Sequence, residues 1–357
     1  MRALVLEGGG TKGSYEVGAY EALLECGYKF DCVIGASIGA LNGAMIVSHR
    51  FKELKKFWRD VNVGEILHLS EETTSAINEN RLSFNFIKDI FSIIKNNGID
   101  LDRLRAILDL MVDEKRVRKS KMNFGLVTVK RKNMEPIEIF IKDIPNNKLN
   151  EYLNASCYLP GFKKMKIIDN EYYYDGGFHD VCPVNMALKN GYDEIIAVRV
   201  KGLGVFKRIE SDTAKITYLE PSRNIGSILS INKRIIMENM KMGYYDTIRY
   251  LKGYDGYYYV FKNRSDFFYK FIARKINERE LRRIKTFFHV NDLKSAIIKS
   301  VEYVLEKEHH DYYHIRDIKR SIKYIKKHYN YTDHFIYEFV CHLKFIFRWL
   351  IKQNIIE

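Results

Sequence analysis

Three short segments contain the residue types that a serine hydrolase needs. They are Gly8-Gly9-Gly10-Thr11-Lys12-Gly13, Gly35-Ala36-Ser37-Ile38-Gly39 and Asp175-Gly176-Gly177. The first is a glycine-rich loop that can cradle an anion. The second places a serine on a sharp turn, and the third places a carboxylate on another turn. Together they predict an oxyanion site, a nucleophile and a base, which are the three parts of an acyl-transfer centre.

Ser37 is the predicted nucleophile. In Gly-x-Ser-x-Gly, glycines two residues before and after the serine relieve clashes where a strand turns sharply into a helix. The apolar strand Cys32–Ile34 precedes this serine and a helix of small residues follows it. The pattern therefore predicts a nucleophile elbow with the hydroxyl near the positive end of a helix. The elbow residues are Gly35, Ala36, Ile38 and Gly39.

The glycine loop is the predicted oxyanion hole. Successive N–H groups of Gly9, Gly10 and Thr11 can point into one space at a helix N-terminus because no Cβ atoms of glycine interfere. Lys12 has two open roles, which are to add positive potential or to anchor the loop through its own hydrogen bonds. The complete predicted set is Gly8, Gly9, Gly10, Thr11, Lys12 and Gly13.

Two nucleotide-binding motifs compete for the same loop, and both fail. The spacing of its glycines also fits Gly-x-Gly-x-x-Gly, but a dinucleotide site requires an acidic residue at the end of the second strand. This chain has Gly35-Ala36-Ser37 there. A Walker A loop is excluded because Lys12 follows a threonine and precedes a glycine.

Asp175 is the predicted base. An aspartate followed by Gly176 and Gly177 is by itself typical of a tight turn, but it follows the apolar strand Tyr172–Tyr174 and accompanies a serine elbow. His179 is near enough in sequence to complete a Ser-His-Asp triad, and a plain loop position is the alternative. The spacing of the histidines, cysteines and acidic residues predicts no metal site.

The alternation of apolar strands and helices predicts an α/β fold with a mainly parallel sheet buried between helices. We expect strands at Ala3–Leu6, Cys32–Ile34, Phe124–Val129, Ile137–Ile141, Tyr172–Tyr174, Ile195–Val200 and Ile216–Tyr218. We expect helices at Ser14–Glu25, Phe84–Ile94, Leu101–Met111, Leu149–Ala155, Val184–Lys189 and 226–250. The helical insertion 50–120 is either a lid or substrate wall or plain structural packing.

Residues 1–260 are the predicted catalytic domain, and the character of the chain changes after residue 263. Residues 264–357 contain no glycine or proline and have 20 lysines and arginines against 12 acidic residues. We expect a basic helical C-terminal region. Its last segment, His334–Asn354, is amphipathic, with Lys344, Arg348 and Lys352 four residues apart. It either lies in a membrane interface or docks on the catalytic domain.

The formal net charge of +14 permits contact with an anionic membrane, an acidic substrate or nucleic acid. A biased composition rich in lysine, isoleucine, asparagine and tyrosine is the other explanation. The five cysteines are odd in number and lack C-x-x-C spacing, which predicts free thiols in a reducing compartment. With no secretory signal and no long apolar run, we expect a cytoplasmic protein, with a peripheral position at the inner membrane surface as an extension.

On these motifs the chain resembles the patatin-like phospholipase family. That family has a G-G-G-x-[RK]-G loop, a G-x-S-x-G elbow and a D-G-[GA] turn in the same order. Its Ala-Ser-x-x-x-Pro block matches Ala155, Ser156 and Pro160. The resemblance covers roughly residues 1–260.

The resemblance implies a three-layer fold and a Ser–Asp dyad, with Ser37 as nucleophile and Asp175 as base. It implies hydrolysis of fatty acyl esters, usually of glycerophospholipids, through an acyl-serine intermediate. It implies no metal, no organic cofactor and no nucleic acid partner. The alternatives are a general carboxylesterase or thioesterase with the same dyad, and a basic scaffold that binds nucleic acid or membrane without catalysis.

Overall fold

The computed structural model describes residues 1–62, 102–160, 162–211, 213–329 and 334–344. The chain divides into two compact units, Met1–Thr247 (unit 1) and Ile248–Glu357 (unit 2). No helix among the described residues is long and apolar enough to span a bilayer. The predicted helix Phe84–Ile94, and with it most of the 50–120 insertion, lies outside the described residues.

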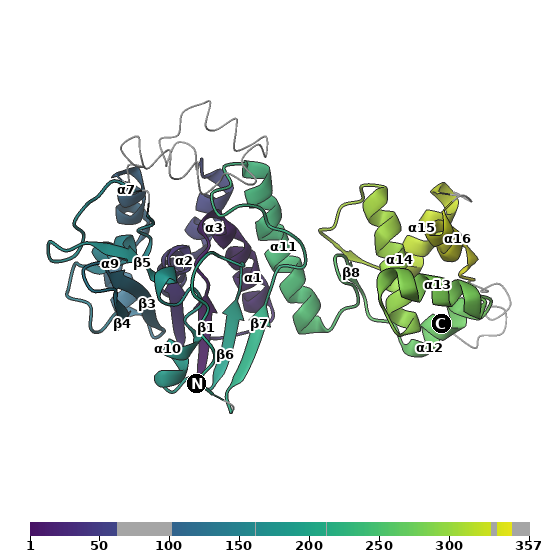
Figure 1. Cartoon of the computed structure of the whole chain (residues 1–357), viewed down its shortest axis with the longest axis horizontal. Coiled ribbons are helices and arrows are strands. Elements are labelled where there is room, and N and C mark those ends of the chain that lie inside the picture. Colours follow the sequence, from purple (N-terminus) through teal and green to yellow (C-terminus); the bar gives the residue numbers. More distant parts are fainter. Residues whose placement is uncertain (63–101, 161, 212, 330–333, 345–357) are drawn as a thin grey trace. The chain divides into compact units, whose positions relative to one another are not determined.

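A mainly parallel seven-stranded sheet forms the centre of unit 1. The strands are β1 (Arg2–Leu6), β2 (Cys32–Ala36), β3 (Asn123–Lys130), β4 (Glu135–Phe140), β5 (Tyr173–Asp175), β6 (Glu194–Val198) and β7 (Lys215–Leu219). Their order is β4-β3-β2-β1-β6-β7, and β5 pairs with β3 (Figure 1). Only the pairs β3–β4 and β3–β5 are antiparallel. The α/β fold predicted from the sequence is confirmed.

Helices cover both faces of this sheet. The helices of unit 1 are α1 (Ser14–Glu25), α2 (Ile38–Val47), α3 (Phe51–Asp60), α7 (Asp102–Met111), α8 (Glu114–Lys119), α9 (Leu149–Ser156), α10 (Val184–Lys189) and α11 (Lys233–Lys252), the last of which runs into unit 2. On one face, Val184 and Ala187 of α10 pack with Cys32 and Ile34 of β2. On the other face, α2 approaches Val33, whose side chain points opposite to its neighbours.

Small residues allow α2 to lie close to the sheet. A methyl group added at Gly43 would lie 3.1 Å from a methyl group of Val33, and one at Gly39 would lie 2.4 Å from the carbonyl oxygen of Leu6. Helix α1 ends as its sequence predicts. Gly27 adopts a left-handed φ of 78°, and the N–H groups of Gly27 and Tyr28 bond to carbonyls of the last turn.

Most predicted boundaries in the described residues lie close to the observed ones, but one is clearly wrong. The helix expected over 226–250 begins only at Lys233. Residues before it form a loop that docks on the glycine loop, because the N–H of Thr11 donates to the carbonyl of Ile228 at 2.8 Å. The Thr11 hydroxyl also bonds to the carbonyls of Ser227 and Ile228. A helical segment there would use those carbonyls internally, so the tertiary contact prevails over local helix propensity.

Unit 2 is helical and has its own core. Its elements are β8 (Val260–Phe261), α12 (Asp266–Ala273), α13 (Glu278–Phe288), α14 (Leu293–Lys307), β9 (Ile315–Arg316), α15 (Ile318–His328) and α16 (Phe335–His342). Side chains cap all five of these helices by accepting a backbone N–H. The caps are Ser265, Asn277, Asp292, Asp317 and His334. The amphipathic segment predicted over His334–Asn354 is helical to His342, and residues 345–357 lie outside the described part.

Candidate active site

The Ser37 backbone has the strained conformation of a nucleophile elbow. Ser37 joins β2 to α2 with φ 53° and ψ −129°, a left-handed conformation that non-glycine residues rarely adopt. The turn is tight enough that a methyl group at Gly35 would lie 2.4 Å from the backbone nitrogen of Ala40. Strain of this kind collects at functional sites, where the surrounding structure holds it in place. It places the side chain at the carboxyl edge of the parallel strands.

Ser156 fixes this elbow from behind. The N–H of Ser37 donates to Oγ of Ser156 at 2.9 Å, and that hydroxyl donates to the carbonyl of Val127 at 2.7 Å. All three groups are buried. One hydroxyl therefore links the backbone of Ser37 to strand β3. The sequence pointed to Ser156 only as part of a family block and assigned it no role.

The strand register brings Asp175 to the same edge. Ala36 pairs with Val127 in β3, and the next residue of β3, Thr128, pairs with Asp175 in β5. Ile137 of β4 occupies the other side of Thr128, so β2 and β5 lie on the same side of β3. Asp175 therefore follows directly beyond the end of β2, next to Ser37.

The carboxyl group of Asp175 is buried and only partly hydrogen-bonded. Its Oδ1 accepts the N–H of Gly177 at 2.7 Å, whereas no partner at hydrogen-bond distance is found for Oδ2 in the described structure. Burial raises the pKa of Asp175 to about 6, against the opposing effects of the Ser37 hydroxyl and the Gly177 N–H. The Ser37 hydroxyl thus favours the carboxylate form of Asp175, although the two side chains do not meet in a regular hydrogen bond in the described structure. Catalytic contacts often have this geometry before substrate binds.

Cys157 is a third polar side chain at this point. It is buried, and its thiol interacts with the hydroxyl of Ser37. Burial and the nearby charge of Asp175 raise the pKa of the thiol, so it stays protonated at neutral pH. All five cysteines are free, as their spacing predicts.

The glycine loop lies against the serine, but its six residues have different roles. A methyl group at Gly8 would lie 3.1 Å from Cβ of Ser37. The N–H groups of Gly8, Thr11 and Lys12 donate to the carbonyls of Val181, Ile228 and Gly9. Within the described residues, the N–H groups of Gly9 and Gly10 have no acceptor. These two amides are therefore the donors that remain for an oxyanion.

Lys12 anchors the loop. Its Nζ donates to the carbonyl of Lys201 at 2.9 Å, which matches the second of its two predicted roles. Burial lowers the pKa of Lys12, and the charge of Glu7 partly offsets this. Glu7 holds the same neighbouring segment, because its carboxylate accepts the N–H groups of Val200 at 2.8 Å and Gly202 at 3.1 Å. Sequence reasoning missed Glu7, which follows β1 with no motif around it.

A chain of main-chain hydrogen bonds connects the glycine loop with the aspartate turn. The N–H of Gly8 donates to Val181 at 2.8 Å, the N–H of Val181 to Val205 at 2.7 Å, and the N–H of Val205 to Gly177 at 2.8 Å. The segment after β6 thus joins two parts of the site that lie far apart in sequence.

His179 forms contacts outside the Ser37–Asp175 pair. Its Nε2 lies 3.1 Å from a carboxylate oxygen of Glu138 and 2.7 Å from Nζ of Lys207. Burial lowers the pKa of His179. Those contacts occupy the ring nitrogen that a triad would need to face the serine. Among the described residues, no group of three or more histidine, cysteine or acidic side chains could hold a metal ion.

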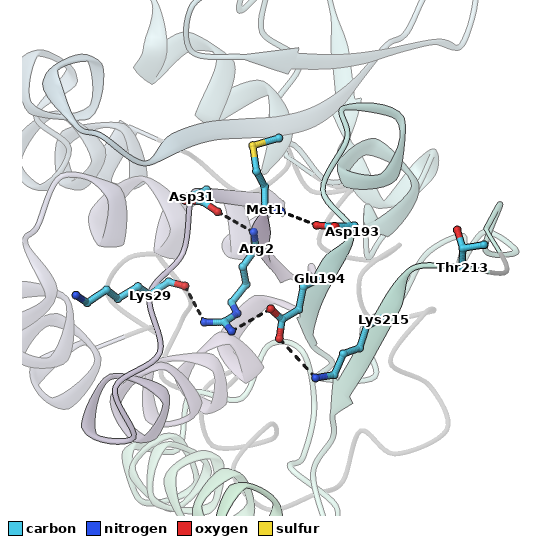
Figure 2. Close-up of a pocket in the computed structure, with 8 residues that line it drawn as sticks. All are labelled: Met1, Arg2, Lys29, Asp31, Asp193, Glu194, Thr213 and Lys215. Atoms are coloured by element: carbon cyan, nitrogen blue, oxygen red, sulfur yellow. Dashed lines mark hydrogen bonds and ion pairs between the residues drawn. The ribbon is translucent and has the colours of Figure 1, made fainter.

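A pocket of about 630 Å³ lies at the opposite, amino edge of the sheet (Figure 2). Figure 2 shows Arg2 bonded to Glu194, and Glu194 also faces Lys215. The N–H of Arg2 donates to Asp31 at 2.7 Å. These charges pair with one another in an open, solvated setting. The pocket has none of the predicted site residues.

Comparison with known proteins supports the fold. The sequence model described as patatin-like phospholipase matches residues 4–188. Patatin-like phospholipase domain-containing protein 7 of Rattus norvegicus is 27% identical over 210 residues, covering 56% of this chain and 13% of that protein. An uncharacterized NTE family protein of Mycobacterium bovis is 23% identical over 202 residues, covering 56% of this chain and 49% of that protein. The chain thus spans half or less of the length of these relatives.

Among solved structures, VipD from Legionella pneumophila aligns with a TM-score of 0.44 and 14% identity over 91% of this chain and 79% of that one. The type III effector protein ExoU aligns with a TM-score of 0.30 and 10% identity over 95% of this chain and 70% of that one. The family match covers just over half of the chain, including the elbow, the glycine loop and the aspartate turn. The chain therefore belongs to the patatin-like phospholipase family.

Proposed function

We propose that this protein is a serine lipid acyl hydrolase that uses Ser37 and Asp175 as a catalytic dyad. One observation carries the proposal: a strained, buried serine lies beside a desolvated carboxylate and a loop with two unoccupied amides. The family resemblance supports phospholipid as the substrate. Residues 1–260 would carry this activity.

In the first half of the reaction, Asp175 accepts the hydroxyl proton of Ser37, directly or through a water molecule, while Oγ attacks the ester carbonyl carbon. The carbonyl oxygen becomes an oxyanion that the amides of Gly9 and Gly10 stabilise. The bond from carbon to the leaving oxygen then breaks. That oxygen takes the proton from Asp175 and departs as an alcohol, which leaves an acyl-serine.

Water completes the cycle. Asp175 accepts a proton from water as the water oxygen attacks the acyl-serine carbonyl. The bond between carbon and Oγ of Ser37 breaks, and Oγ takes the proton back from Asp175. The products are a fatty acid and the free enzyme. No histidine takes part in either half.

The raised pKa of Asp175 suits this role. An ordinary aspartate is a weak base, whereas a carboxylate whose pKa is about 6 is still ionised at pH 7 and accepts a proton more readily. The same burial that raises the pKa excludes water from the contact with Ser37, which strengthens the interaction between them.

Covalent labelling tests the nucleophile. We expect a fluorophosphonate to label the wild-type chain on Ser37 and to leave Ser37→Ala unlabelled. Ser48→Ala is a matched control, because Ser48 is also buried and its hydroxyl bonds only to the carbonyl of Met45. Equal labelling of wild type and Ser37→Ala would refute the proposal.

His179→Ala separates a dyad from a triad. Because the ring contacts Glu138 and Lys207, we expect this variant to retain most of the turnover. A collapse of turnover in a variant that melts like wild type would establish a triad instead.

A comparison of acyl chain lengths tests the substrate class. A lipid acyl hydrolase should turn over long-chain phospholipid esters faster than short-chain soluble esters or thioesters. A preference for the short substrates would favour the alternative, a carboxylesterase or thioesterase with the same dyad.

We further propose that residues 264–357 form a basic helical region with a separate role, and that the protein contacts anionic membranes peripherally. The surplus of eight positive charges in that region supports electrostatic attraction to acidic lipids. The cytoplasmic location expected from the sequence stays a prediction. If removing this region from a folded protein leaves binding to anionic vesicles unchanged, its proposed membrane role is wrong.

A further inference from the structure

Exposed apolar side chains gather in one segment of unit 1. Leu203, Val205 and Phe206 are 68%, 49% and 41% exposed within four residues of chain. Phe178, in the aspartate turn, is 42% exposed. Single exposed apolar residues are common on soluble proteins, but a cluster of them marks a contact surface. We call these four residues the apolar rim.

The apolar rim is fixed to the aspartate turn. Val205 donates its N–H to the carbonyl of Gly177 and accepts the N–H of Val181. A methyl group at Gly177 would lie 3.2 Å from the carbonyl oxygen of Leu203. The rim segment also follows β6, so it lies at the carboxyl edge where Ser37 ends β2. The backbone that carries these exposed side chains therefore lies next to the candidate site.

Basic side chains flank the rim on both sides. The segment from Arg199 to Arg208 contains four cationic residues and no acidic one. Arg199 pairs with Glu7 and Glu220, and Lys207 contacts His179. Lys201 and Arg208 are exposed, and no acidic partner for them is found among the described residues. Two cations are thus available to an external anion.

An apolar tip between available cations matches the surface of an anionic bilayer. The apolar side chains can enter the boundary between headgroups and acyl chains, while lysine and arginine pair with lipid phosphates. An acidic protein surface would pair with the cations but would not account for the exposed apolar side chain of Leu203. The position beside an acyl hydrolase site also favours lipid.

We propose that the apolar rim is the surface through which the catalytic unit docks on an anionic phospholipid bilayer. This inference rests on the proposed function, because docking would bring acyl esters to Ser37. It differs from the role proposed for residues 264–357, since it places a lipid contact within unit 1 itself.

Binding to vesicles tests the rim. The full chain carrying Ser37→Ala would be sedimented with vesicles of equal parts phosphatidylcholine and phosphatidylglycerol, so that lipid is not consumed. Adding Leu203→Gln should lower the partition coefficient about tenfold, as expected for loss of most of one buried leucine. Leu203→Trp should raise it. Leu24→Gln is the matched control, because Leu24 is an exposed leucine near the end of α1, at the amino edge.

Turnover gives a second readout in the presence of Ser37. The ratio of vesicle hydrolysis to soluble-ester hydrolysis should fall about tenfold in Leu203→Gln and stay constant in Leu24→Gln. If Leu203→Gln and Leu203→Trp both bind vesicles like Leu24→Gln, the rim is not the docking surface. If binding follows Leu203 but fluorophosphonate never labels Ser37, docking stands and the proposed hydrolase function fails. Equal binding to pure phosphatidylcholine vesicles would overturn the requirement for anionic lipid.

Discussion

The two edges of the sheet in unit 1 differ in whether their polar groups are paired. At the amino edge, an open pocket of about 630 Å³ is lined by charges that pair with one another, such as Arg2 with Glu194 at 2.9 Å (Figure 2). At the carboxyl edge, Asp175 is buried, its Oδ2 has no hydrogen-bond partner in the part of the chain that the structure describes, and Ser37 is held in a strained backbone conformation. The open pocket is chemically quiet, and the proposed reactive groups lie at the opposite edge of the sheet.

The difference shows which features distinguish the proposed catalytic centre. A paired surface charge is already in its lowest-energy arrangement and can do little chemistry. A desolvated carboxylate and unoccupied amides have free energy to gain when a substrate supplies charge in the right place. Unsatisfied and strained groups are therefore the features that distinguish this site from the open pocket. Four changes test this difference between the two edges.

Replacing Asp175 with asparagine should have the largest effect. The amide keeps the shape and still accepts the Gly177 N–H, but it cannot take a proton, so turnover should fall about 10³-fold or more. The variant should also be more stable at pH 8, by about 1–3 kcal/mol, because the native carboxylate carries a cost of burial. Steady-state kinetics and urea denaturation measure both.

The sign of the stability effect depends on pH. The pKa of Asp175 rises from its ordinary 3.8 to about 6 on folding. Well below pH 3.8 the carboxyl is protonated in both states, so Asp175→Asn and wild type should be equally stable there. The difference in unfolding free energy should grow between pH 3.8 and about pH 6 and stay constant above. If Asp175→Asn were instead less stable than wild type above pH 6, Asp175 would not be desolvated.

The pH profile of wild-type turnover should follow the same group. Asp175 acts as a base only when ionised, so kcat/KM should fall about tenfold per pH unit below pH 6 and level off above it. Initial rates with a soluble ester measure this. A profile that stays flat down to pH 4 would assign the base to a carboxylate with an ordinary pKa.

Ser156→Ala should have an intermediate effect. It leaves the buried N–H of Ser37 and the carbonyl of Val127 without their partner, which should cost about 1–3 kcal/mol of stability. A small shift of the elbow should lower kcat about 10–100-fold with little change in KM. Ser156→Cys, which keeps a weak acceptor, should recover part of kcat. A loss of stability with unchanged kcat would make Ser156 purely structural.

Glu194→Gln at the amino edge should have the smallest effect. It removes ion pairs with Arg2 and Lys215, but all three side chains are partly exposed, so the change in unfolding free energy should stay below about 1 kcal/mol. Fluorophosphonate labelling of Ser37 should proceed at the wild-type rate. A clear drop in labelling would mean that the two edges are coupled.

The sequence was most informative where a residue's role depends on its immediate neighbours. The strand, serine and helix around Ser37 form a local pattern, and the glycines that permit the turn lie within two residues. Helix α1 follows the same logic, because Ser14–Glu25 and the stop at Gly27 are read from consecutive residues. These features need no knowledge of distant contacts.

Prediction was weaker where contacts between distant segments determine the local structure. The glycine loop was predicted as one set of donors, but Val181 and Ile228 take up the N–H groups of Gly8 and Thr11. No local pattern shows that these carbonyls will lie there. The late start of α11 has the same cause, because the loop around Ile228 is held by Thr11. Glu7 had no motif to single it out.

The bonds that run from Gly8 through Val181 and Val205 to Gly177 use only backbone amides and carbonyls. The side chains of Val181 and Val205 can therefore change without removing the bonds that set the spacing between the aspartate turn and the glycine loop. Gly8 and Gly177 are more constrained, because a methyl group at either would lie 3.1 Å from the side chain of Ser37 or Asp175. A proline, an insertion or a deletion would break the path. Homologues with divergent residues but equal segment lengths should thus keep the same spacing, whereas a single added residue after β6 should uncouple the two loops.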